Sequence, residues 1–384
     1  MDSELINIVK AQYKRTFGDR PLLVFSPGRI NLIGEHTDYN NGFVMPAAID
    51  KGIAMALSVS KESNSTIISK NFKETIELDI NDKKLESNNH WSDYIRGVVL
   101  EFQKLVPVMP QIKAVIGSDL PIGAGMSSSA AILNAISFGL NLLFDLGLDK
   151  LELARLGRKA ENKFVGVQSG LMDQFTGLFG KKEHLIILDC QSLDYKFIKW
   201  PFNGYSLILV DSMVRRDLKN SSFNQRKQNC SEVAGHFGKN SLRDLDMIQL
   251  DKRKNEIKEE KYRQARFVLN ENQRVHDASK AIINAEMDTL GQLMIDSHHG
   301  LKNEYEVSCD QLDFLVESLI KHKGVKGARM MGGGFGGCTI NLIKEDEIPG
   351  FQIEIQNKYQ RRLGKTCHFY DVNLSDGTHQ IIHS

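Results

Sequence analysis

The sequence predicts an α+β protein that folds as two domains. Its 384 residues exceed the size that one hydrophobic core usually organises, so a second domain is expected. Segments that alternate apolar and polar residues, typical of antiparallel strands with one face in water, stand between segments whose apolar residues recur at helical spacing. Hydrophobic residues make up 41% of the chain and charged residues 25%, which is typical of an ordinary globular protein.

Charge and cysteine usage narrow the classes of function. The formal net charge of +1 gives no electrostatic basis for nucleic acid or an anionic membrane as the main partner. The five cysteines are scattered without a Cys-x-x-Cys pair, which argues against a disulfide framework or a cysteine zinc site and favours the cytoplasm. The N-terminus lacks a signal-peptide pattern, and no stretch reaches the ~18 apolar residues of a membrane span.

The first predicted elements are a helix followed by strands. Residues 3–17 place apolar side chains at helical spacing, and Gly18 ends that pattern. A short apolar strand is predicted at residues 22–25. Further strands are predicted where alternation and β-branched residues recur, at residues 44–60, 65–69 and 75–78.

A polar segment, residues 26–40, follows the first strand. Within it Arg29, Glu35, His36 and Asp38 stand among turn-forming glycines. Carboxylates accept hydrogen bonds from sugar hydroxyls and arginine supplies a fixed positive charge, so this set suits a polyhydroxylated ligand. Taken alone, the residues also fit a surface loop with a solvated ion pair.

The next helix is predicted at residues 91–102, where apolar side chains recur at positions i, i+3, i+4 and i+7. Its start carries Trp91 and Tyr94. Aromatic residues placed in this way either stack on a purine or fill the core, and core packing is the commoner use.

A loop rich in glycine and serine joins a strand at residues 112–116 to another helix. It runs from Leu120 to Ala131 and contains Gly123-Ala124-Gly125-Met126-Ser127-Ser128-Ser129. Glycines allow the backbone to approach an anion, serines offer hydroxyls, and the N-terminus of the following helix supplies free N–H groups. The loop therefore indicates phosphate binding. Because its spacing is neither that of a Walker A loop nor that of a Rossmann fingerprint, an ordinary glycine-rich turn is the alternative.

Two carboxylates after this loop are candidate functional groups. A helix predicted over residues 150–165 carries Glu161, which is either a magnesium ligand or a solvated helix carboxylate. Asp173 follows within Gly170-Leu171-Met172-Asp173-Gln174. A single carboxylate among glycine and apolar residues is a candidate general base.

The second half of the chain alternates strands with longer helices. Strands are predicted at residues 185–189 and 205–210, and Trp200-Pro201 between them predicts the passage to a second domain. Helices are expected at residues 224–237, 250–261, 262–296 and 312–322. Because positive and negative charges are mixed over residues 250–261, that stretch fits a solvated helix face and not a nucleic-acid patch.

Three segments stand out together: Pro27–Asn40, Gly123–Ala130 and Gly332–Cys338. The last begins with five glycines in six positions, which requires close backbone approach or unusual dihedral angles. In this order the three segments resemble the motifs of the GHMP small-molecule kinases, and the first resembles the galactokinase signature specifically. The segments Ala160-Glu161-Asn162 and Gly170–Gln174 are also similar to the galactokinase active-site region.

The resemblance implies a fold and a reaction. It implies a ribosomal-S5-like N-terminal domain, residues 1–200, that binds the sugar and the ATP phosphates, and a ferredoxin-like C-terminal domain, residues 201–384, with the active site between them. A return of the last strands to the first domain is left open. The implied reaction is ATP-dependent phosphorylation of the C1 hydroxyl of galactose, which gives galactose 1-phosphate and ADP. The alternatives are a 1-kinase for N-acetylgalactosamine or another sugar and, less favoured because Arg29, Asp173 and the serines are intact, a non-catalytic galactose sensor.

The resemblance also implies roles for single residues. Asp173 would accept the proton of the C1 hydroxyl, and Arg29 would stabilise the charge that develops at the nucleophile and the transferred phosphoryl group. This division fits phosphoryl transfer, which asks the protein mainly for positioning and electrostatic stabilisation. The implied sugar-binding residues are Glu35, His36, Thr37, Asp38, Gly170, Asp173 and Phe223.

Position 223, within Ser221–Arg226, departs from the family pattern. Many galactokinases carry a sugar-contacting tyrosine there, whereas this chain has Phe223. Phenylalanine is more similar to the N-acetylgalactosamine kinases, which leaves the specificity at the sugar's 2-position open.

ATP and Mg²⁺ are the implied cofactors. The implied nucleotide-binding residues are Gly123, Ala124, Gly125, Met126, Ser127, Ser128 and Ser129 around the phosphates, with Ser69 and Trp91 near the nucleoside. Ser129 and Glu161 are the implied ligands of Mg²⁺, a hard ion that prefers oxygen. With galactose and ATP as its small-molecule partners and no nucleic acid or membrane, we expect a cytoplasmic monomer.

Overall fold

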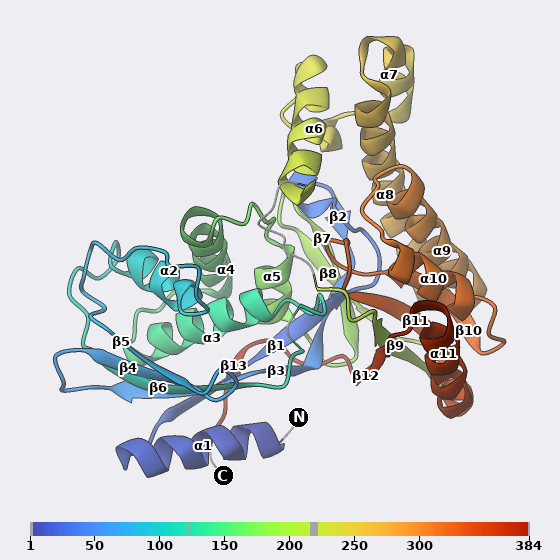
Figure 1. The fold of residues 1–384 in the computed structure, drawn as a ribbon. Coiled ribbons are helices and arrows are strands. Elements are labelled where there is room, and N and C mark those ends of the chain that lie inside the picture. Colours follow the sequence, from blue (N-terminus) through green and yellow to red (C-terminus); the bar gives the residue numbers. More distant parts are fainter. Residues whose placement is uncertain (1–2, 122, 216–221, 383–384) are drawn as a thin grey trace.

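The computed structural model describes residues 3–121, 123–215 and 222–382, which form two lobes. In Figure 1 the N-terminal lobe holds a six-stranded sheet with helices on both faces, and the C-terminal lobe holds a four-stranded sheet with its own helices. A three-stranded sheet lies between these lobes. The predicted α+β class is confirmed, while the division of the chain at residue 200 stays a prediction.

The six-stranded sheet has the order β13-β1-β3-β6-β4-β5. Its strands are β1 (Leu22–Asn31), β3 (Pro46–Val59), β4 (Ser65–Ser69), β5 (Glu74–Leu78), β6 (Ile112–Ser118) and β13 (His379–Gln380). Neighbouring strands pair antiparallel except β4 and β6, which run parallel. The predicted antiparallel arrangement is therefore confirmed for the pair β4 and β5.

Strand β1 is longer than the segment predicted at residues 22–25. It continues to Asn31 because the start of the polar segment is buried and its backbone pairs with β3, Arg29 opposite Ala48. The register of this pairing shifts between Pro27 and Arg29. Since an irregularity of this kind re-aims the side chains beyond it, the shift sets the direction of Arg29.

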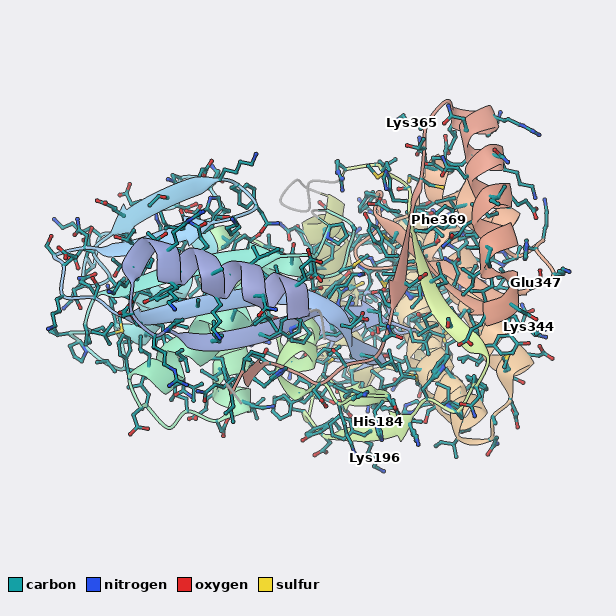
Figure 2. All side chains as sticks on the ribbon, turned by 90° about the horizontal axis from the view of Figure 1, so that it is seen from below. His184, Lys196, Lys344, Glu347, Lys365 and Phe369 are labelled. Atoms are coloured by element: carbon teal, nitrogen blue, oxygen red, sulfur yellow. The ribbon has the colours of Figure 1, made fainter. Side chains whose placement is uncertain are left out.

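Helices cover both faces of this sheet. Helix α1 (Ser3–Phe17) packs Ile6, Val9 and Tyr13 onto one face, which Figure 2 shows from below. The opposite face carries α2 (Asp93–Phe102), α3 (Ser128–Leu143), α4 (Lys150–Ala160) and α5 (Met172–Phe179). The helix predicted over residues 150–165 is α-helical only to Ala160 and continues as a π-helical turn, η2 (Glu161–Val165). Such wide turns are frequent at functional sites.

The remaining strands form two smaller sheets. The three-stranded sheet, order β2-β7-β8, consists of β2 (Phe43–Val44), β7 (His184–Asp189) and β8 (Tyr195–Lys199). The four-stranded sheet, order β10-β11-β9-β12, consists of β9 (Tyr205–Asp211), β10 (Val325–Met330), β11 (Cys338–Lys344) and β12 (His368–Val372). Its neighbouring strands are antiparallel, and α11 (Ile348–Leu363) joins β11 to β12. This β-α-β-β-α-β connectivity is ferredoxin-like, as predicted.

The helices between β9 and β10 are α6 (Ser222–His236), α7 (Met247–Lys252), α8 (Glu259–Ile283), α9 (Met287–Asn303) and α10 (Asp310–Leu319). The short 3-10 turns of the described chain are η1 (Asp38–Asn40), η3 (Leu242–Asp244), η4 (Lys254–Glu256) and η5 (Glu345–Glu347). The helix predicted over residues 250–261 is wrong, because Arg253 and Ile257 leave the helical backbone region. Among the described residues, no helix is long and apolar enough to cross a membrane.

Candidate active site

A cavity of about 340 Å³ lies where the polar segment after β1, the glycine-serine loop and the start of α5 meet. The predicted site residues that line it are Arg29, Glu35, His36, Asp38, Gly123, Gly125, Ser127, Ser128, Ser129, Glu161, Gly170, Asp173 and Phe223. Gly332 and Gly333 of the third glycine segment also line it. Segments from both halves of the chain therefore form one cavity.

Arg29 and Asp173 form a bidentate ion pair at the cavity wall. Arg29 donates from Nε to Asp173 Oδ1 at 2.7 Å and from Nη2 to Oδ2 at 2.9 Å. Burial alone would lower the pKa of Arg29, but the charge of Asp173 and, more weakly, of Glu35 and Asp38 raises it above its ordinary value. The guanidinium is thus a permanent cation beside a carboxylate that is 24% exposed. Bidentate pairs of this kind fix both partners in orientation.

The glycine-serine loop is tied to the same pair. Arg29 Nη1 donates to the Gly125 carbonyl at 2.5 Å, its backbone N–H donates to the Met126 carbonyl at 3.1 Å, and Ser127 Oγ donates to Asp173 Oδ2 at 2.5 Å. The hydrogen bond between Ser127 and Asp173 could not be foreseen from the sequence, because 46 positions separate the two residues.

The first part of the loop, Gly123–Met126, can contact a ligand mainly through its backbone. Gly123 and Gly125 have φ angles of 78° and 86°, which glycine adopts without strain. The side chains of Ala124 and Met126 are buried, so what these two residues can offer a ligand is their backbone. Helix α3 starts directly after Ser127, and the N-terminus of a helix favours an anion.

Glu161 and Ser129 lie together at one end of the cavity. Glu161, on η2, accepts hydrogen bonds from Ser169 Oγ at 2.5 Å and Gln174 Nε2 at 2.8 Å, and Ser129 also hydrogen-bonds to it. Burial and the charge of Asp173 raise the pKa of Glu161, although these hydrogen bonds oppose the shift. Serine and carboxylate oxygens fit Mg²⁺, which takes few protein ligands and completes its shell with water and phosphate. Within the described residues, no group of three or more His, Cys, Asp or Glu side chains could hold a metal.

Asp38 faces the cavity from η1. Burial, followed by the charge of Asp173, raises the pKa of Asp38 from 3.8 to about 7. Gly170 lies against this carboxylate, since a Cβ at position 170 would stand 2.1 Å from Asp38 Oδ2. A side chain at position 170 would therefore displace Asp38, which explains why glycine is needed there.

Thr37 is the predicted sugar-binding residue that turns away from the cavity. It is fully buried, and its Oγ1 donates to the carbonyls of Gly34 at 2.8 Å and Phe43 at 2.6 Å. Its observed contacts therefore shape the loop that presents Glu35 and His36.

An aromatic cluster forms the wall beside His36. The Phe223 ring lies 5.5 Å from the His36 ring and 5.2 Å from the Tyr39 ring. His36 Nδ1 lies 2.6 Å from the Tyr39 hydroxyl and forms a hydrogen bond with it. The same Tyr39 hydroxyl lies 2.9 Å from the Tyr305 hydroxyl. Tyr305 was not predicted at the site, and it is 266 positions away from Tyr39. Of the segment compared with the family pattern, Phe223 is described, whereas Ser221 lies outside the described residues.

The two predicted nucleoside residues do not line the cavity. Ser69 ends β4 and is buried, and its Oγ accepts the N–H of Phe72 at 3.3 Å. Trp91 stacks on Phe72 at 5.8 Å, and its Nε1 donates to Glu74 at 2.8 Å. Tyr94, in the first turn of α2, does line the cavity. Contact of Ser69 and Trp91 with a nucleoside stays a prediction.

Arg215, after β9, is a further cation at the glycine-serine loop that sequence reasoning missed. A Cβ at Gly123 would stand 3.3 Å from Arg215 Cδ and Nη1. The residue belongs to the C-terminal half of the chain, and no local motif marks it. It brings positive charge from that half to the loop that is expected to hold phosphates.

The comparisons with known proteins identify the class of protein first. The family descriptions "GHMP kinases N terminal domain" and "GHMP kinases C terminal" match residues 93–181 and 278–359. The crystal structure of Methanococcus jannaschii mevalonate kinase covers 93% of this chain and 99% of its own at a TM-score of 0.67 and 18% identity, a likeness of fold alone. Fold and site define a GHMP-type kinase.

The more specific matches all concern one family. The description "Galactokinase galactose-binding signature" matches residues 11–59. The galactokinase of Thermotoga neapolitana is 41% identical over 358 residues, which are 93% of this chain and 99% of that protein. The galactokinase of Actinobacillus pleuropneumoniae serotype 3 is 38% identical over 363 residues, 93% and 94% of the two chains. The crystal structure of Lactococcus lactis galactokinase complexed with galactose has a TM-score of 0.93 at 33% identity and covers 97% and 98%. The chain belongs to the galactokinase family.

Proposed function

We propose that this chain transfers the γ-phosphoryl group of ATP to the C1 hydroxyl of galactose and releases galactose 1-phosphate and ADP. The observation that carries the proposal is the Arg29–Asp173 ion pair, which lies between the polar segment and the glycine-serine loop. A cation and a proton acceptor at this junction are what a sugar hydroxyl needs to attack a phosphoryl group. The Lactococcus lactis relative, crystallised with galactose, supports the choice of sugar.

The sugar would bind against the polar segment and α5. Glu35 and Asp38 offer carboxylate oxygens that accept hydrogen bonds from hydroxyl groups, and His36 offers a ring nitrogen. Gly170 leaves the space in which Asp38 and a sugar ring can meet. The sugar ring would thus be held with one hydroxyl toward Asp173, as in-line transfer requires.

The reaction itself would use two side chains. Asp173 would take the proton from the C1 hydroxyl, whose oxygen forms a bond to the γ-phosphorus while the bond from that phosphorus to the β–γ bridging oxygen breaks. Arg29 would stabilise the charge on the attacking oxygen and on the transferred group. Protein phosphoryl transfer depends mainly on such positioning and charge stabilisation.

Ser129 and Glu161 would hold Mg²⁺ with the ATP phosphates, and residues Gly123 to Ser129 would wrap those phosphates. A bound Mg²⁺ neutralises phosphate charge during transfer. The backbone N–H groups at the start of α3 add further positive potential at the same place.

A coupled assay of ADP formation tests the proposal across galactose, N-acetylgalactosamine and glucose. We expect the highest kcat/KM with galactose. A preference for N-acetylgalactosamine would overturn the substrate, and binding of galactose without turnover would instead favour a sensor.

N-acetylgalactosamine is the second candidate substrate because Phe223 stands at the sugar wall without a hydroxyl. Phe223→Tyr would restore a hydrogen bond to galactose, so the ratio of kcat/KM for galactose over N-acetylgalactosamine should rise about two- to tenfold. An unchanged ratio would show that this ring does not set specificity.

We also propose a cytoplasmic monomer without a nucleic-acid or membrane partner, divided into domains near residue 200. The near-zero net charge supports the lack of a nucleic-acid or membrane partner, and the scattered free cysteines support the cytoplasm. Light scattering after size exclusion tests the oligomeric state, and a dimer mass would overturn it.

A further inference from the structure

The sugar-facing loop has an unusual backbone that must be held from outside. Gly34 and His36 have φ angles of 93° and 62°, and for histidine a positive φ is uncommon. A Cβ at Gly34 would stand 2.7 Å from the Phe43 carbonyl and 2.8 Å from Val275 of α8. Conformations of this kind persist when their surroundings over-determine them.

Helix α8 supplies a buried carboxylate beneath this loop. Glu271 is fully buried, and its Oε1 accepts the backbone N–H of Gly34 at 2.9 Å and of Glu35 at 3.3 Å. The same oxygen accepts from Ser297 Oγ of α9 at 2.7 Å, while Oε2 accepts from Arg274 Nε at 2.6 Å. Glu271 does not line the cavity. Its carboxylate oxygens therefore accept hydrogen bonds from the loop and from Ser297 and Arg274, and not from a ligand in the cavity.

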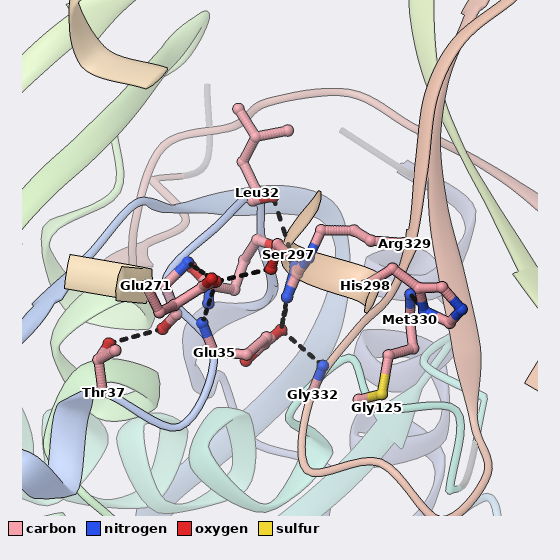
Figure 3. Close-up of polar contacts among 12 residues, drawn as sticks. Leu32, Glu35, Thr37, Gly125, Glu271, Ser297, His298, Arg329, Met330 and Gly332 are labelled. Atoms are coloured by element: carbon pink, nitrogen blue, oxygen red, sulfur yellow. Dashed lines mark hydrogen bonds and ion pairs between the residues drawn. The ribbon is translucent and has the colours of Figure 1, made fainter. Parts of the chain in front are cut away.

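Strand β10 and the third glycine segment hold the Glu35 side chain. Arg329 is fully buried, its Nη2 lies 3.0 Å from Glu35 Oε1, and its Nη1 donates to the Asn31 carbonyl at 3.0 Å. The Gly332 N–H donates to the same Glu35 oxygen at 2.6 Å. Figure 3 shows Glu271, Arg329 and Gly332 converging on the loop around Glu35.

The cluster is balanced in charge. Two carboxylates, Glu35 and Glu271, face two guanidinium groups, Arg274 and Arg329. Burial alone would raise the pKa of Glu271, but the charges of Arg274 and Arg329 together with the Ser297 hydrogen bond lower it below its ordinary value. The ionised carboxylate is thus the stable form, and charged acceptors make the stronger hydrogen bonds.

We infer that Glu271 is a positioning residue for the sugar, through which α8 of the C-terminal half fixes the loop that presents Glu35 and His36 to the cavity. The inference rests on the proposed function, since it assumes that these two side chains hold galactose. It predicts that Glu271 acts on sugar binding and leaves nucleotide binding unchanged, because the hydrogen bonds of Glu271 within the described chain go to Gly34, Glu35, Arg274 and Ser297 and not to the glycine-serine loop.

Steady-state kinetics of the full chain test this inference with three variants. Glu271→Gln removes the charge at nearly constant shape. Glu271→Asp keeps the charge but shortens the reach to the loop. Asp277→Asn, two turns along α8, is the control, because Asp277 contacts only its helix neighbours Gln273 and Lys280 among its described hydrogen-bond partners.

For both Glu271 variants we expect the KM for galactose to rise about tenfold, the scale of a hydrogen bond to a charged group, while the KM for ATP stays within about twofold of the control. Unchanged galactose KM with a lower melting temperature would overturn the inference, since Glu271 would then only stabilise the fold. Recovery of wild-type KM in Glu271→Asp, with a raised KM in Glu271→Gln, would also support it, because the charged acceptor would then be what holds the loop. If Glu271→Gln does not fold, Glu271→Asp decides alone. Absence of galactose turnover in the wild-type chain would instead overturn the proposed function.

Discussion

Asp173 contacts both the polar segment and the glycine-serine loop through its two carboxylate oxygens, Arg29 on one side and Ser127 on the other. Asp173→Asn removes the proton acceptor at nearly constant volume, so kcat should fall about 10²-fold or more. ATP binding, measured by calorimetry, should persist because the glycine-serine loop, which we propose holds the phosphates, keeps its sequence. Ser127→Ala, which keeps the carboxylate, is the control and should lose less. Near-normal turnover of Asp173→Asn would refute the assignment as base.

Asp38 predicts a dependence of stability on pH. Its pKa is about 7 in the folded chain, raised by burial and by Asp173, against 3.8 as the ordinary value. Between these two values the folded chain keeps a proton that the unfolded chain has lost, so rising pH lowers the free energy of unfolding until about pH 7. Above about pH 7 the buried Asp38 carboxylate is charged, and its full destabilising effect on the folded chain is present.

Asp38→Asn removes this titration. Its melting temperature should exceed that of the wild type by about 2–4 °C at pH 8 and by clearly less at pH 5. Thermal melts at both pH values measure the difference, with the exposed Asp288→Asn as control. An equal gain at both pH values would contradict the raised pKa. The same variant should bind galactose more weakly, a trade of stability against function that is common at binding sites.

At the scale of residues, the sequence indicated the kinds of groups but not their directions. Arg29 and Asp173 are 144 positions apart, so only the family resemblance joined them. Thr37 and Asp38 are adjacent in the same motif, yet Thr37 bonds the loop backbone while Asp38 lines the cavity. The residue types alone do not show which of the two side chains faces the cavity. That direction depends on the local backbone, which has a positive φ at His36.

At the scale of elements, patterns predicted regular segments and missed irregular ones. The helix Ser3–Phe17 is confirmed with its predicted bounds, since its apolar residues recur at helical spacing and pack together on the sheet. The π-helical turn Glu161–Val165 was predicted as ordinary helix, because apolar spacing does not reveal one widened turn. The sequence left open a return of the last strands to the first domain but gave no residues for strand β13, because its two residues pair with β1 only through the tertiary fold.

The π-helical turn η2 leads to a prediction about metal dependence. It places Glu161 where Ser169, Gln174 and Ser129 surround the carboxylate. Glu161→Gln removes one charged oxygen ligand, so the Mg²⁺ concentration for half-maximal activity should rise about tenfold. Activity should partly recover at high Mg²⁺.

A magnesium titration of the purified variant measures this shift, and Glu183→Gln, at an exposed position, is the control. An unchanged titration would leave Glu161 as a structural carboxylate that only orders Ser169 and Gln174.

At the scale of the whole molecule, the two lobes share the site through contacts that no local pattern predicts. Glu271 bonds the backbone of Gly34 across 237 positions, and Arg329 bonds Glu35 across 294. Glu271 lies within the helix expected over residues 262–296, and Arg329 lies on β10 just before the third glycine segment. The sequence therefore predicted the α+β fold and many of the residues that line the cavity, while the buried charges that fix the loop around Glu35 required the structure.

The end of the chain returns to the N-terminal lobe, where β13 pairs with β1. Thr378 is buried next to β13, and its Oγ1 donates to the Gly177 carbonyl of α5 at 2.8 Å and lies 2.9 Å from Ser26 Oγ of β1. These two elements carry Asp173 and Arg29, so Thr378 connects the elements that hold this ion pair to the end of the chain.

Thr378→Val keeps the shape of the side chain but removes its hydroxyl, which leaves the Ser26 hydroxyl with one partner fewer in a buried place. The free energy of unfolding should fall by about 1–3 kcal/mol, measured by urea denaturation. Ser375→Ala is the control, because the Ser375 hydroxyl bonds only the nearby Asp376 carbonyl among its described partners. Since β1 and α5 are the elements that the hydroxyl ties together, the variant should also lose kcat at temperatures well below its unfolding midpoint. Full stability and full turnover in Thr378→Val would show that the pairing of β13 with β1 is sufficient to hold the end of the chain in place.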